Sequence, residues 1–498
     1  MKDKLKKISD YEWEIPKSGN MLVPAKFFSS ELLLKDVEET AVEQLTNVAQ
    51  LPGIQKHALA MADMHSGYGF PIGGVAAFDM KEGIISPGGV GYDINCGVRF
   101  LVTDLKVKDF LAKRDQFLEL IFKNVPCGVG KEGRVRLNKD QLLDVLKNGS
   151  KWAVKNGYGV KADLPKTEEG GCMDQADPSL ISKEALQRGL PQIGSVGSGN
   201  HFLEVDKISN IFDKDAAKTL GIDPECVTVL IHCGSRGLGH QVASDYIKLM
   251  ENKVGTKHLP DRQLVNAPLS SDIGQDYFKA MCAAANFAFT NRQMIMHWTR
   301  ETFEKIYDNV KVNLMYDICH NICKVEEGKI DGKKTKVAVM RKGATRAFGP
   351  GHEELPKEYR KIGQPILIPG SMGTASYVLV GTQKAEMISF SSSAHGAGRV
   401  MSRHAALQKF KGETIKQELH DQNIELRSRG LKGIAEEAPG VYKDVDEVIR
   451  VTDGAGIGKK VVRVTPLAVI KGWIKITEIF ITKWVVGIKR GIQIWLRL

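Results

Sequence analysis

The sequence predicts an α+β fold in which residues 1–472 form one large unit around a shared site. Helical and strand-like patterns both occur along the 498-residue chain, and no internal repeat or disordered linker divides these residues. The residues best suited to bind a metal ion are spread from residue 93 to residue 395. One site must therefore draw on most of the chain, although its length would allow roughly two to four domains.

The first part of the chain alternates between helical and strand-like patterns. Apolar side chains recur at helical spacing over residues 29–50 and predict an amphipathic helix there. Short apolar runs between glycine turns predict strands and loops from residue 57 to residue 105. Helical patterns follow over 107–125 and 140–155, and the polar stretch 160–180 is expected to be a surface insertion.

The second part contains the strongest single patterns. The β-branched run Val227–His232 ends at a Gly-Ser-Arg-Gly turn, which predicts a buried strand that leads into a functional loop. Residues 274–307 form the longest helical pattern and are rich in Ala, Phe and Met. Further strands are predicted at Val312–Tyr316, Lys336–Met340, Pro365–Ile368 and Ala385–Ser389, and a helix at Ala397–Ile424.

The overall charge and the cysteines restrict the class of protein. A net charge of +11 and a pI near 9.0 favour a polyanionic partner, such as nucleic acid, a nucleotide or an anionic membrane. The N-terminal Met1–Lys7 has no apolar segment of a secretory signal, and no stretch before residue 472 is apolar enough to span a bilayer. We therefore expect a cytoplasmic protein with no stable membrane association, whose eight scattered cysteines stay reduced.

The last 26 residues, Trp473–Leu498, differ from the rest in composition. They hold three of the six tryptophans, many isoleucines, five Lys or Arg and one Glu. Charge interrupts them too often for a transmembrane helix. They are expected to be an appended basic, hydrophobic extension, which is either a weakly structured tail or an amphipathic segment lying on a surface.

The glycine-rich stretch Gly88–Arg99 carries an acid and a thiol three residues apart, Asp93 and Cys96. The run is too rich in glycine for a regular helix or strand, and glycine lets the main chain bend sharply or approach a ligand closely. A carboxylate oxygen and a sulfur at this spacing can turn toward one metal ion or two adjacent ions. Together with four histidine-bearing motifs further along the chain, this stretch indicates a metal-dependent enzyme rather than a scaffold.

Four further motifs place a histidine in a turn rich in Gly, Asn or Ser: His201, His232, His320 and His395. A lone histidine is more often a packed or solvated residue than a ligand. Four of them beside an Asp-x-x-Cys loop nevertheless favour a metal site. Thiolate and imidazole would suggest zinc, whereas Asp93 and the nearby amide and hydroxyl groups suggest a harder ion, and the sequence leaves that choice open.

Taken in order, the motifs strongly resemble those of the RtcB family of RNA ligases. The runs that carry the resemblance are Asp63-Met64-His65, Asp93–Cys96, Gly199-Asn200-His201, His232–Gly237, Arg341–Arg346, Pro369–Thr374 and His395–Arg399. The resemblance covers residues 1–472. It implies one RtcB-like domain with a central metal and nucleotide site, followed by the extension 473–498.

The resemblance also implies a reaction. RtcB-type ligases join an RNA 3′-phosphate or 2′,3′-cyclic phosphate to a 5′-hydroxyl, using GTP and two Mn²⁺. His395 matches the histidine that takes up GMP from GTP. By the same similarity Cys96 bridges the two Mn²⁺ ions, one of which is also held by Asp93 and His201 and the other by His232 and His320.

The remaining roles follow from the same matches. Asp63 lies in the motif that supports the histidine nucleophile. Residues that match the guanylate pocket are Asn200, Glu204, Ser371, Ser376, His395, Gly396, Gly398, Tyr442 and Lys471. Basic residues expected to meet RNA are Arg188, Arg236, Arg399 and Arg403. The expected partners are tRNA halves or broken RNA ends, and the activator archease, which many members use, is a candidate partner.

Two other functions stay open on the residues alone. A metallophosphoesterase would use the same ions to hydrolyse phosphate esters and would not need His395 as a nucleophile. An RNA-binding protein with a structural zinc site would hold tetrahedral zinc and perform no nucleotide chemistry. Neither alternative accounts for the ordered match of so many motifs. Whether the task is tRNA splicing, messenger splicing or RNA repair is also open.

Overall fold

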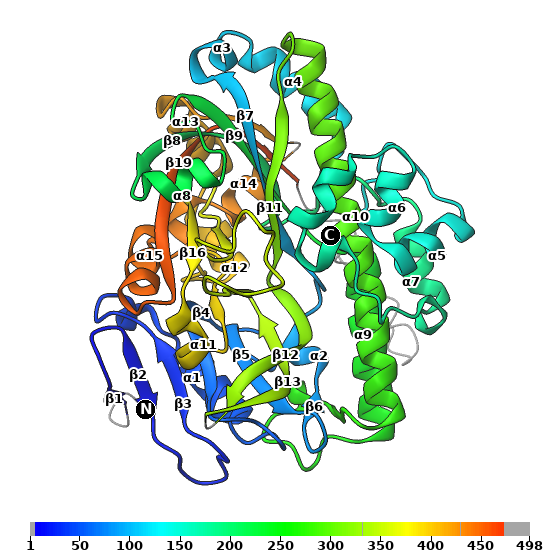
Figure 1. The fold of residues 1–498 in the computed structure, drawn as a ribbon, viewed down its shortest axis with the longest axis vertical. Coiled ribbons are helices and arrows are strands. Elements are labelled where there is room, and N and C mark those ends of the chain that lie inside the picture. The colour runs from blue at the N-terminus through cyan, green and yellow to red at the C-terminus, as the bar shows by residue number, and fades with distance from the viewer. Residues whose placement is uncertain (1–4, 331, 429, 473–498) are drawn as a thin grey trace, which may run out of the picture.

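Two large β-sheets form the centre of the structure, a computed structural model that describes residues 5–330, 332–428 and 430–472. Helices surround them, so the predicted α+β class is confirmed (Figure 1). The seven-stranded sheet has the spatial order β1 (Lys6–Lys7), β2 (Glu12–Ile15), β3 (Ala25–Phe28), β4 (Ala58–His65), β5 (Ile72–Asp79), β13 (Lys333–Lys342) and β12 (Asn321–Ile330).

The second sheet carries most of the site. Its eight strands are ordered β11 (Val312–Cys319), β7 (Gly97–Lys106), β9 (Cys226–Cys233), β8 (Phe202–Ile211), β19 (Gly458–Lys471), β16 (Ser376–Gly381) and β15 (Pro365–Ile368), with β18 (Glu425–Ser428) pairing in parallel with β19. All eight residues of β9 are buried. A run of Val, Ile and Leu suits such a central strand, because neighbours cover both of its faces.

Two small strand pairs tie the sheets and loops together. β14 (Ala344–Arg346) pairs with β17 (Ser392–Ala394), which brings the segment before His395 next to the end of β13. β6 (Ile84–Ile85) pairs with β10 (Ala267–Pro268) and fixes the approach to the glycine-rich loop.

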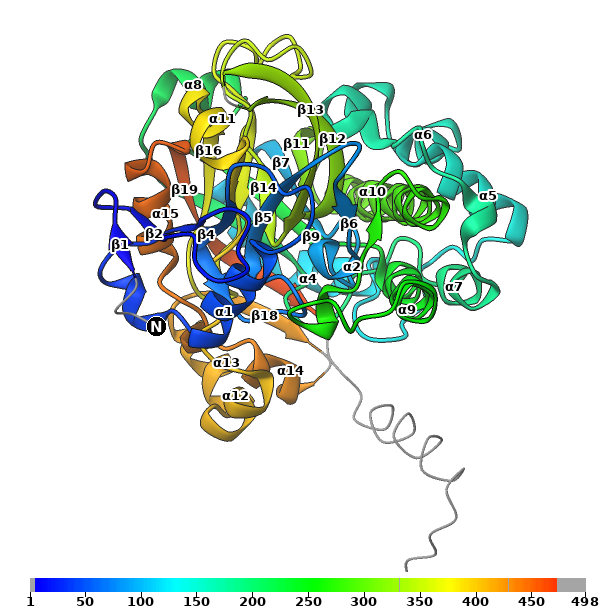
Figure 2. The same ribbon diagram turned by 90° about the horizontal axis from the view of Figure 1, so that it is seen from below.

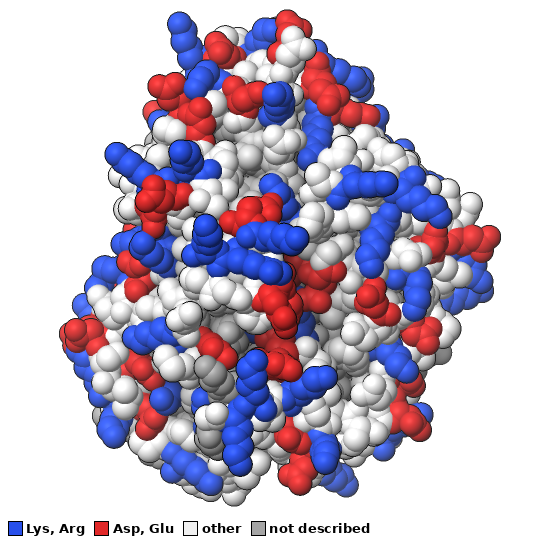
Figure 3. Space-filling view, in the orientation of Figure 1, with Lys and Arg blue, Asp and Glu red and all other residues white. Residues whose placement is uncertain are grey.

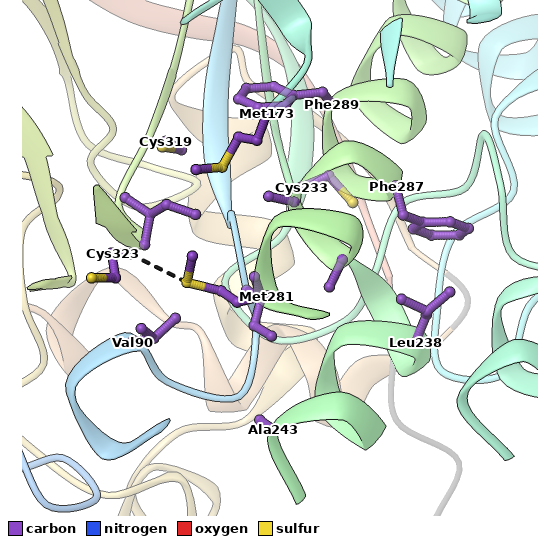
Figure 4. Close-up of a cluster of buried hydrophobic side chains, with 14 of the residues drawn as sticks. Val90, Met173, Cys233, Leu238, Ala243, Met281, Phe287, Phe289, Cys319 and Cys323 are labelled. Atoms are coloured by element: carbon purple, nitrogen blue, oxygen red, sulfur yellow. Dashed lines mark hydrogen bonds between the residues drawn. The ribbon is translucent and has the colours of Figure 1, made fainter. Parts of the chain in front are cut away.

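The predicted longest helix is confirmed as α10 (Asp272–Ile306), which has 35 residues. Most of its side chains are buried, and the small Ala283, Ala284 and Ala285 allow close packing. α10 belongs to the same buried cluster as the segments beside the predicted ligands, which include Cys233 and Cys319 (Figure 4). The helix therefore forms a rigid backing for the site.

The other helices cover the outside of the sheets. α9 (Arg236–Lys253) lies beside α10, and α12, α13 and α14 gather in a separate group (Figure 2). The remaining helices are α1 (Glu39–Val48), α2 (Pro87–Val90), α3 (Val107–Ala112), α4 (Arg114–Asn124), α5 (Lys139–Asn148), α6 (Ser150–Lys155), α7 (Lys183–Gly189), α8 (Lys214–Thr219), α11 (Gln383–Ser389), α12 (Arg403–Lys409), α13 (Gly412–Asp421), α14 (Leu431–Glu436) and α15 (Val445–Gly454). None of the described helices is long and apolar enough to cross a membrane.

Several predicted elements are wrong in extent or kind. The helix expected over 29–50 is only α1, because Glu38 has an extended backbone (ψ 136°) that separates it from a 3₁₀ turn at Leu33–Asp36. Ala385–Ser389 lies in helix α11 and not in a strand, since the Thr382 side chain caps that helix. The helix expected at 397–424 is divided into α12 and α13.

The stretch 160–180 is not a surface insertion. Asp163 and Glu168 are each 2% exposed. Arg300 binds Asp163 through two bonds of 2.8 Å, and Lys324 lies 2.9 Å from Glu168. The polar residues of this stretch therefore hold it onto the core by buried ion pairs. The glycine-rich stretch 88–99 also differs from expectation, because α2 and the start of β7 lie within it.

Candidate functional site

Four neighbouring strands deliver the predicted metal ligands to one edge of the second sheet. Val98, near the start of β7, pairs with His232 near the end of β9, and His232 also pairs with Phe202 at the start of β8. Because these strands are antiparallel, the start of one lies beside the end of the next. Asp93 and Cys96 precede β7, His201 precedes β8 and His320 follows β11, so all five side chains meet there.

The five side chains form one connected, mostly buried group. Asp93 Oδ2 lies 2.8 Å from His201 Nε2, and Cys96 Sγ lies 3.2 Å from the Nε2 atoms of both His201 and His232. His232 Nε2 is in turn 3.2 Å from His320 Nε2. The Cys96 sulfur thus lies within reach of both His201 and His232.

The chemistry of this group suits bound cations. Burial, with the neighbouring His201, lowers the pKa of His232 well below its usual value, and burial chiefly does the same for His320. Both imidazoles are therefore neutral and can offer lone pairs. Burial and the Asp93 charge raise the pKa of the Cys96 thiol to about 12. A cation at the thiol would reverse this effect and stabilise the thiolate. The cluster of Cys96, His201 and His232 could hold a metal ion.

One arginine of α10 holds the ligand-bearing segments in place. Arg292 donates to the carbonyl oxygens of Asn95 (2.7 Å) and Cys233 (3.0 Å), which flank Cys96 and His232. It also makes two hydrogen bonds of 2.8 Å to Asp317, which lies on β11 three residues before His320. Arg99 adds a further bond of 2.8 Å to the same carboxylate. This buried network fixes three of the ligand segments relative to one another.

His395 is held by a buried carboxylate at the edge of this group. Asp63 Oδ2 on β4 lies 2.6 Å from His395 Nδ1 and accepts bonds from the backbone N–H groups of His395 (3.1 Å) and Gly396 (3.2 Å). The carboxylate keeps the proton on Nδ1 and leaves the Nε2 lone pair free. The His395 ring centre is 4.6 Å from that of His320. Gly398 has φ 77°, and a Cβ there would lie 2.2 Å from the Asp63 carbonyl oxygen.

A cavity of about 350 Å³ runs past His395 and the metal ligands. Of the predicted guanylate residues, seven line it: Asn200, Ser371, His395, Gly396, Gly398, Tyr442 and Lys471. Glu204 and Ser376 lie behind this wall, where Ser376 Oγ donates to Glu204 Oε1 over 3.1 Å. Burial raises the pKa of Glu204 to about 8. The structure thus brings all of these residues to one region.

The sequence assigned no individual role to two charged residues that line the cavity, although Lys342 lies in the run Arg341–Arg346 that carries the family resemblance. Glu437 is 1% exposed and lies 3.1 Å from Arg399 Nη1 and 3.8 Å from Lys471 Nζ, while the Tyr442 hydroxyl donates to it. Lys342 donates to the carbonyl oxygens of Tyr68 and Phe70, and burial lowers its pKa to about 7. Glu437 directly follows Glu436, and two adjacent acidic residues are typical of a solvent-exposed segment. The sequence therefore gives no sign that Glu437 is buried at the cavity.

The four predicted RNA-binding arginines occupy two places. Arg399 and Arg403 line the cavity, and the Arg403 side chain is 56% exposed. Arg236 begins α9 and donates to the Gly128 carbonyl oxygen over 2.9 Å, whereas Arg188 is exposed and paired with Glu184. Basic and acidic side chains are interspersed on the face in Figure 3. The net positive charge is therefore not gathered into one patch on that face.

The fold and the site thus define an α+β protein in which a buried His/Cys cluster that could hold a metal ion lies beside a carboxylate-held histidine. A family model described as tRNA-splicing ligase RtcB matches residues 44–472. The chain is therefore a member of the RtcB family, as the motifs predicted.

Relatives from several archaea are similar over nearly their whole length. A protein named tRNA-splicing ligase RtcB from Thermococcus kodakarensis is 52% identical over 477 residues, which are 94% of this chain and 99% of that protein. The protein of the same name from Archaeoglobus fulgidus is 53% identical with the same coverage. That from Methanococcus maripaludis is 50% identical over 480 residues, 95% of this chain and 100% of the relative.

Proposed function

We propose that this protein is an RNA ligase that uses GTP and two Mn²⁺ ions to join a 3′-phosphate or 2′,3′-cyclic phosphate end to a 5′-hydroxyl end. The names of its relatives support a task in tRNA splicing, and RNA repair uses the same chemistry. The observation that carries the proposal is the bond of 2.6 Å between Asp63 and His395, beside a His/Cys cluster that can bind metal.

The Asp63 carboxylate gives His395 the properties of a nucleophile. With its proton held on Nδ1, the imidazole can attack the α-phosphorus of GTP through Nε2, and pyrophosphate leaves. The ring becomes positively charged as the N–P bond forms, and the neighbouring carboxylate stabilises that charge. A cyclic phosphate end is first opened by water to a 3′-phosphate. An oxygen of the 3′-phosphate then attacks the GMP phosphorus, the N–P bond breaks and His395 is released, and finally the 5′-hydroxyl attacks the activated 3′-phosphate and displaces GMP to close the phosphodiester bond.

The two Mn²⁺ ions would be held by Asp93, Cys96, His201, His232 and His320. Bound cations would offset the charge of the triphosphate and orient its α-phosphorus toward His395. Because the centre of the His320 ring lies 4.6 Å from that of His395, the same cluster can position the phosphate beside the nucleophile. Carboxylate and imidazole ligands suit Mn²⁺, and the single thiolate is the softer member of the set.

The guanylate would occupy the end of the cavity near Tyr442 and Lys471. Glu204, Ser376 and Asn200 offer acceptors and donors for the edge of a guanine base, and Ser371, Gly396 and Gly398 lie near the ribose and phosphate. Arg399 and Arg403 at the cavity and Arg188 and Arg236 near α9 would hold RNA phosphates, a contribution that salt weakens.

The proposal is tested by incubating the full chain with α-³²P-GTP and Mn²⁺ and running a denaturing gel. We expect a protein label that acid removes and base does not, and that His395→Ala abolishes. His420→Ala is the matched control, because His420 is an exposed histidine whose side chain is 63% accessible. Metal content is measured on every variant. Absence of label in the metal-loaded wild type, with and without archease, would rule out the proposed chemistry.

A further inference from the structure

Two tyrosines form the wall between the cavity and a second, outer hollow. Tyr68 and Tyr92 line both the cavity and this hollow, which has a volume of about 420 Å³. The outer hollow also has Lys248 and Arg262 on its rim, both exposed. The tyrosines therefore stand where a chain passing from the metal centre into the outer hollow would lie.

The aromatic surface continues onto α9. The Tyr68 and Tyr92 rings meet edge to face with centres 5.4 Å apart, and His240 stacks on Tyr92 at 4.7 Å with an angle of 25° between the planes. We call these three side chains the aromatic ledge. Tyr68 and Tyr92 are only partly buried and His240 is exposed, so the ledge keeps ring surface available to a ligand.

The backbone beneath the ledge is fixed. The Gly69 N–H donates to Gln263 Oε1 over 2.9 Å, and the Lys342 ammonium donates to the Tyr68 carbonyl oxygen. Tyr92 directly precedes Asp93 in the loop that carries the predicted metal ligand. Ring surfaces held in this way lose little conformational freedom when a flat ligand stacks on them.

We propose that the aromatic ledge is a stacking site for a nucleobase of the single-stranded RNA end at the metal centre, with Lys248 and Arg262 facing the phosphates beyond it. The inference rests on the proposed ligase function and adds a base subsite to it. Stacking on aromatic rings accepts any base, because every base has a π-face, so the ledge would bind RNA ends without regard to sequence. Such tolerance suits a site that receives broken RNA ends.

Charge at the hollow agrees with this ligand. Arg262 forms two bonds to Glu251, of 2.8 and 3.0 Å, yet its side chain is 73% exposed and can still meet a phosphate. Lys248 is exposed on the same helix as His240. Burial raises the pKa of Tyr68 to about 12, so its phenol stays neutral at working pH. A neutral ring beside two cations matches the base and the phosphate of one nucleotide.

The test is a cycle that combines protein variants with abasic RNA. Binding is measured by fluorescence polarisation on two unligatable oligonucleotides, one with a 3′-phosphate end and one with a 5′-hydroxyl end, each with or without its terminal base. We expect the abasic change to weaken binding of one strand by about tenfold in the wild type. Tyr68→Ala and His240→Ala should weaken binding of the intact strand to a similar extent. They should not weaken binding of the abasic strand any further. The strand that responds is the occupant.

Controls separate this inference from the proposed function. Tyr68→Phe should restore binding, because it keeps the ring, and Phe212→Ala should bind like wild type, since Phe212 is a 48% exposed aromatic residue stacked on Tyr377 at the far end of β8. Labelling with GTP should be retained in the ledge variants. Two outcomes would overturn the ledge and leave the ligase intact, provided that labelling is retained. In the first, the loss of affinity from the protein substitution and that from the abasic change multiply as independent effects. In the second, neither strand loses affinity. Loss of labelling in the wild type would overturn the ligase itself.

Discussion

At the scale of single residues, one oxygen of Asp63 sets the state of His395. Oδ2 accepts from the ring and from two backbone N–H groups, so both the tautomer and the orientation of the ring depend on one carboxylate. The second oxygen, Oδ1, is buried without a hydrogen-bond partner. We therefore propose that Asp63 holds the imidazole in place and balances the charge that develops on it during attack.

We expect Asp63→Asn to slow transfer of GMP to His395 by roughly 10²- to 10⁴-fold, as loss of the orienting carboxylate does in other histidine-based sites. The amide removes the charge that stabilises the ring during attack. The rate of protein labelling with α-³²P-GTP measures the effect. Metal content and melting temperature should stay near wild type, and a variant that labels at the wild-type rate would contradict this role.

Glu204 links stability to pH in the absence of nucleotide. Burial raises its pKa from 4.5 to about 8, so the folded protein binds this proton more tightly than the unfolded chain does. The stability that Glu204 contributes is full below about pH 4.5 and is lost as the pH rises to about 8. Ionising Glu204 therefore costs free energy until a ligand donates hydrogen bonds to its carboxylate.

We expect Glu204→Gln to raise the melting temperature of nucleotide-free protein at pH 8 by roughly a few degrees, and to leave it nearly unchanged at pH 5. The same variant should bind GTP more weakly, because the amide cannot accept two donors from guanine. Calorimetry at both pH values measures the first effect and nucleotide titration the second. Glu327→Gln, on an exposed carboxylate, should show neither change.

At the scale of elements, α10 does more than fill the core. Through Arg292 it fixes the segment before β7 and the last residue of β9, and the bonds from Arg292 to Asp317 fix β11. Arg99 and Arg292 share the Asp317 carboxylate, and all three side chains are fully buried. Removing the shared acid would leave two buried guanidinium groups without a counter-charge.

We therefore expect Asp317→Asn to destabilise the protein by about 3–5 kcal/mol, as breaking a buried pair does. Metal affinity should fall with it, since three ligand segments lose their common anchor. Denaturant unfolding and metal titration provide the measurements. Glu225→Gln, which removes an exposed partner of Lys106, should cost less than about 1 kcal/mol. An equally small loss of unfolding free energy in Asp317→Asn would contradict the role of Asp317 in holding the three ligand segments together.

The elements that the sequence predicted well are those with long, uniform patterns. α10, β9 and β15 follow from helical spacing or β-branched runs, and the predicted ligands follow from motifs. The failures have a tertiary cause. Burial of Asp163 depends on Arg300, 137 positions away in the chain, and no local pattern shows that pairing. Glu437 was missed for a related reason, because its cationic partners Arg399 and Lys471 come from distant segments, Arg399 lying 38 positions away in the chain.

At the scale of the whole molecule, the site joins the N-terminal sheet to the last strand described. Asp63 lies on β4, and Lys471 ends β19, which pairs with β8 and β18. The predicted boundary between the domain 1–472 and the extension 473–498 is not tested, because the extension lies outside the described residues. We propose that residues up to 472 contain the complete guanylylation site.

We expect a chain ending at Gly472 to label with GTP as the full chain does, because Lys471 keeps its strand pairing and its neighbour Glu437. Labelling rates of the two chains, prepared and metal-loaded alike, provide the comparison. A chain ending at Val469 is the matched control and should lose most labelling, since it lacks Lys471. A large loss on removal of 473–498 alone would contradict the proposed boundary.

The long strand β19 has a consequence for biosynthesis. It lies in the middle of the second sheet, between β8 and β16, and it delivers Lys471 to the guanylate end of the cavity. A ribosome adds about 5–20 residues per second. Between the synthesis of β16 and that of β19, the nascent polypeptide leaves unpaired the edges of β8 and β16 between which β19 will later insert. The growing chain cannot form a complete nucleotide pocket before this strand emerges, so chaperones that shield strand edges should matter most late in translation.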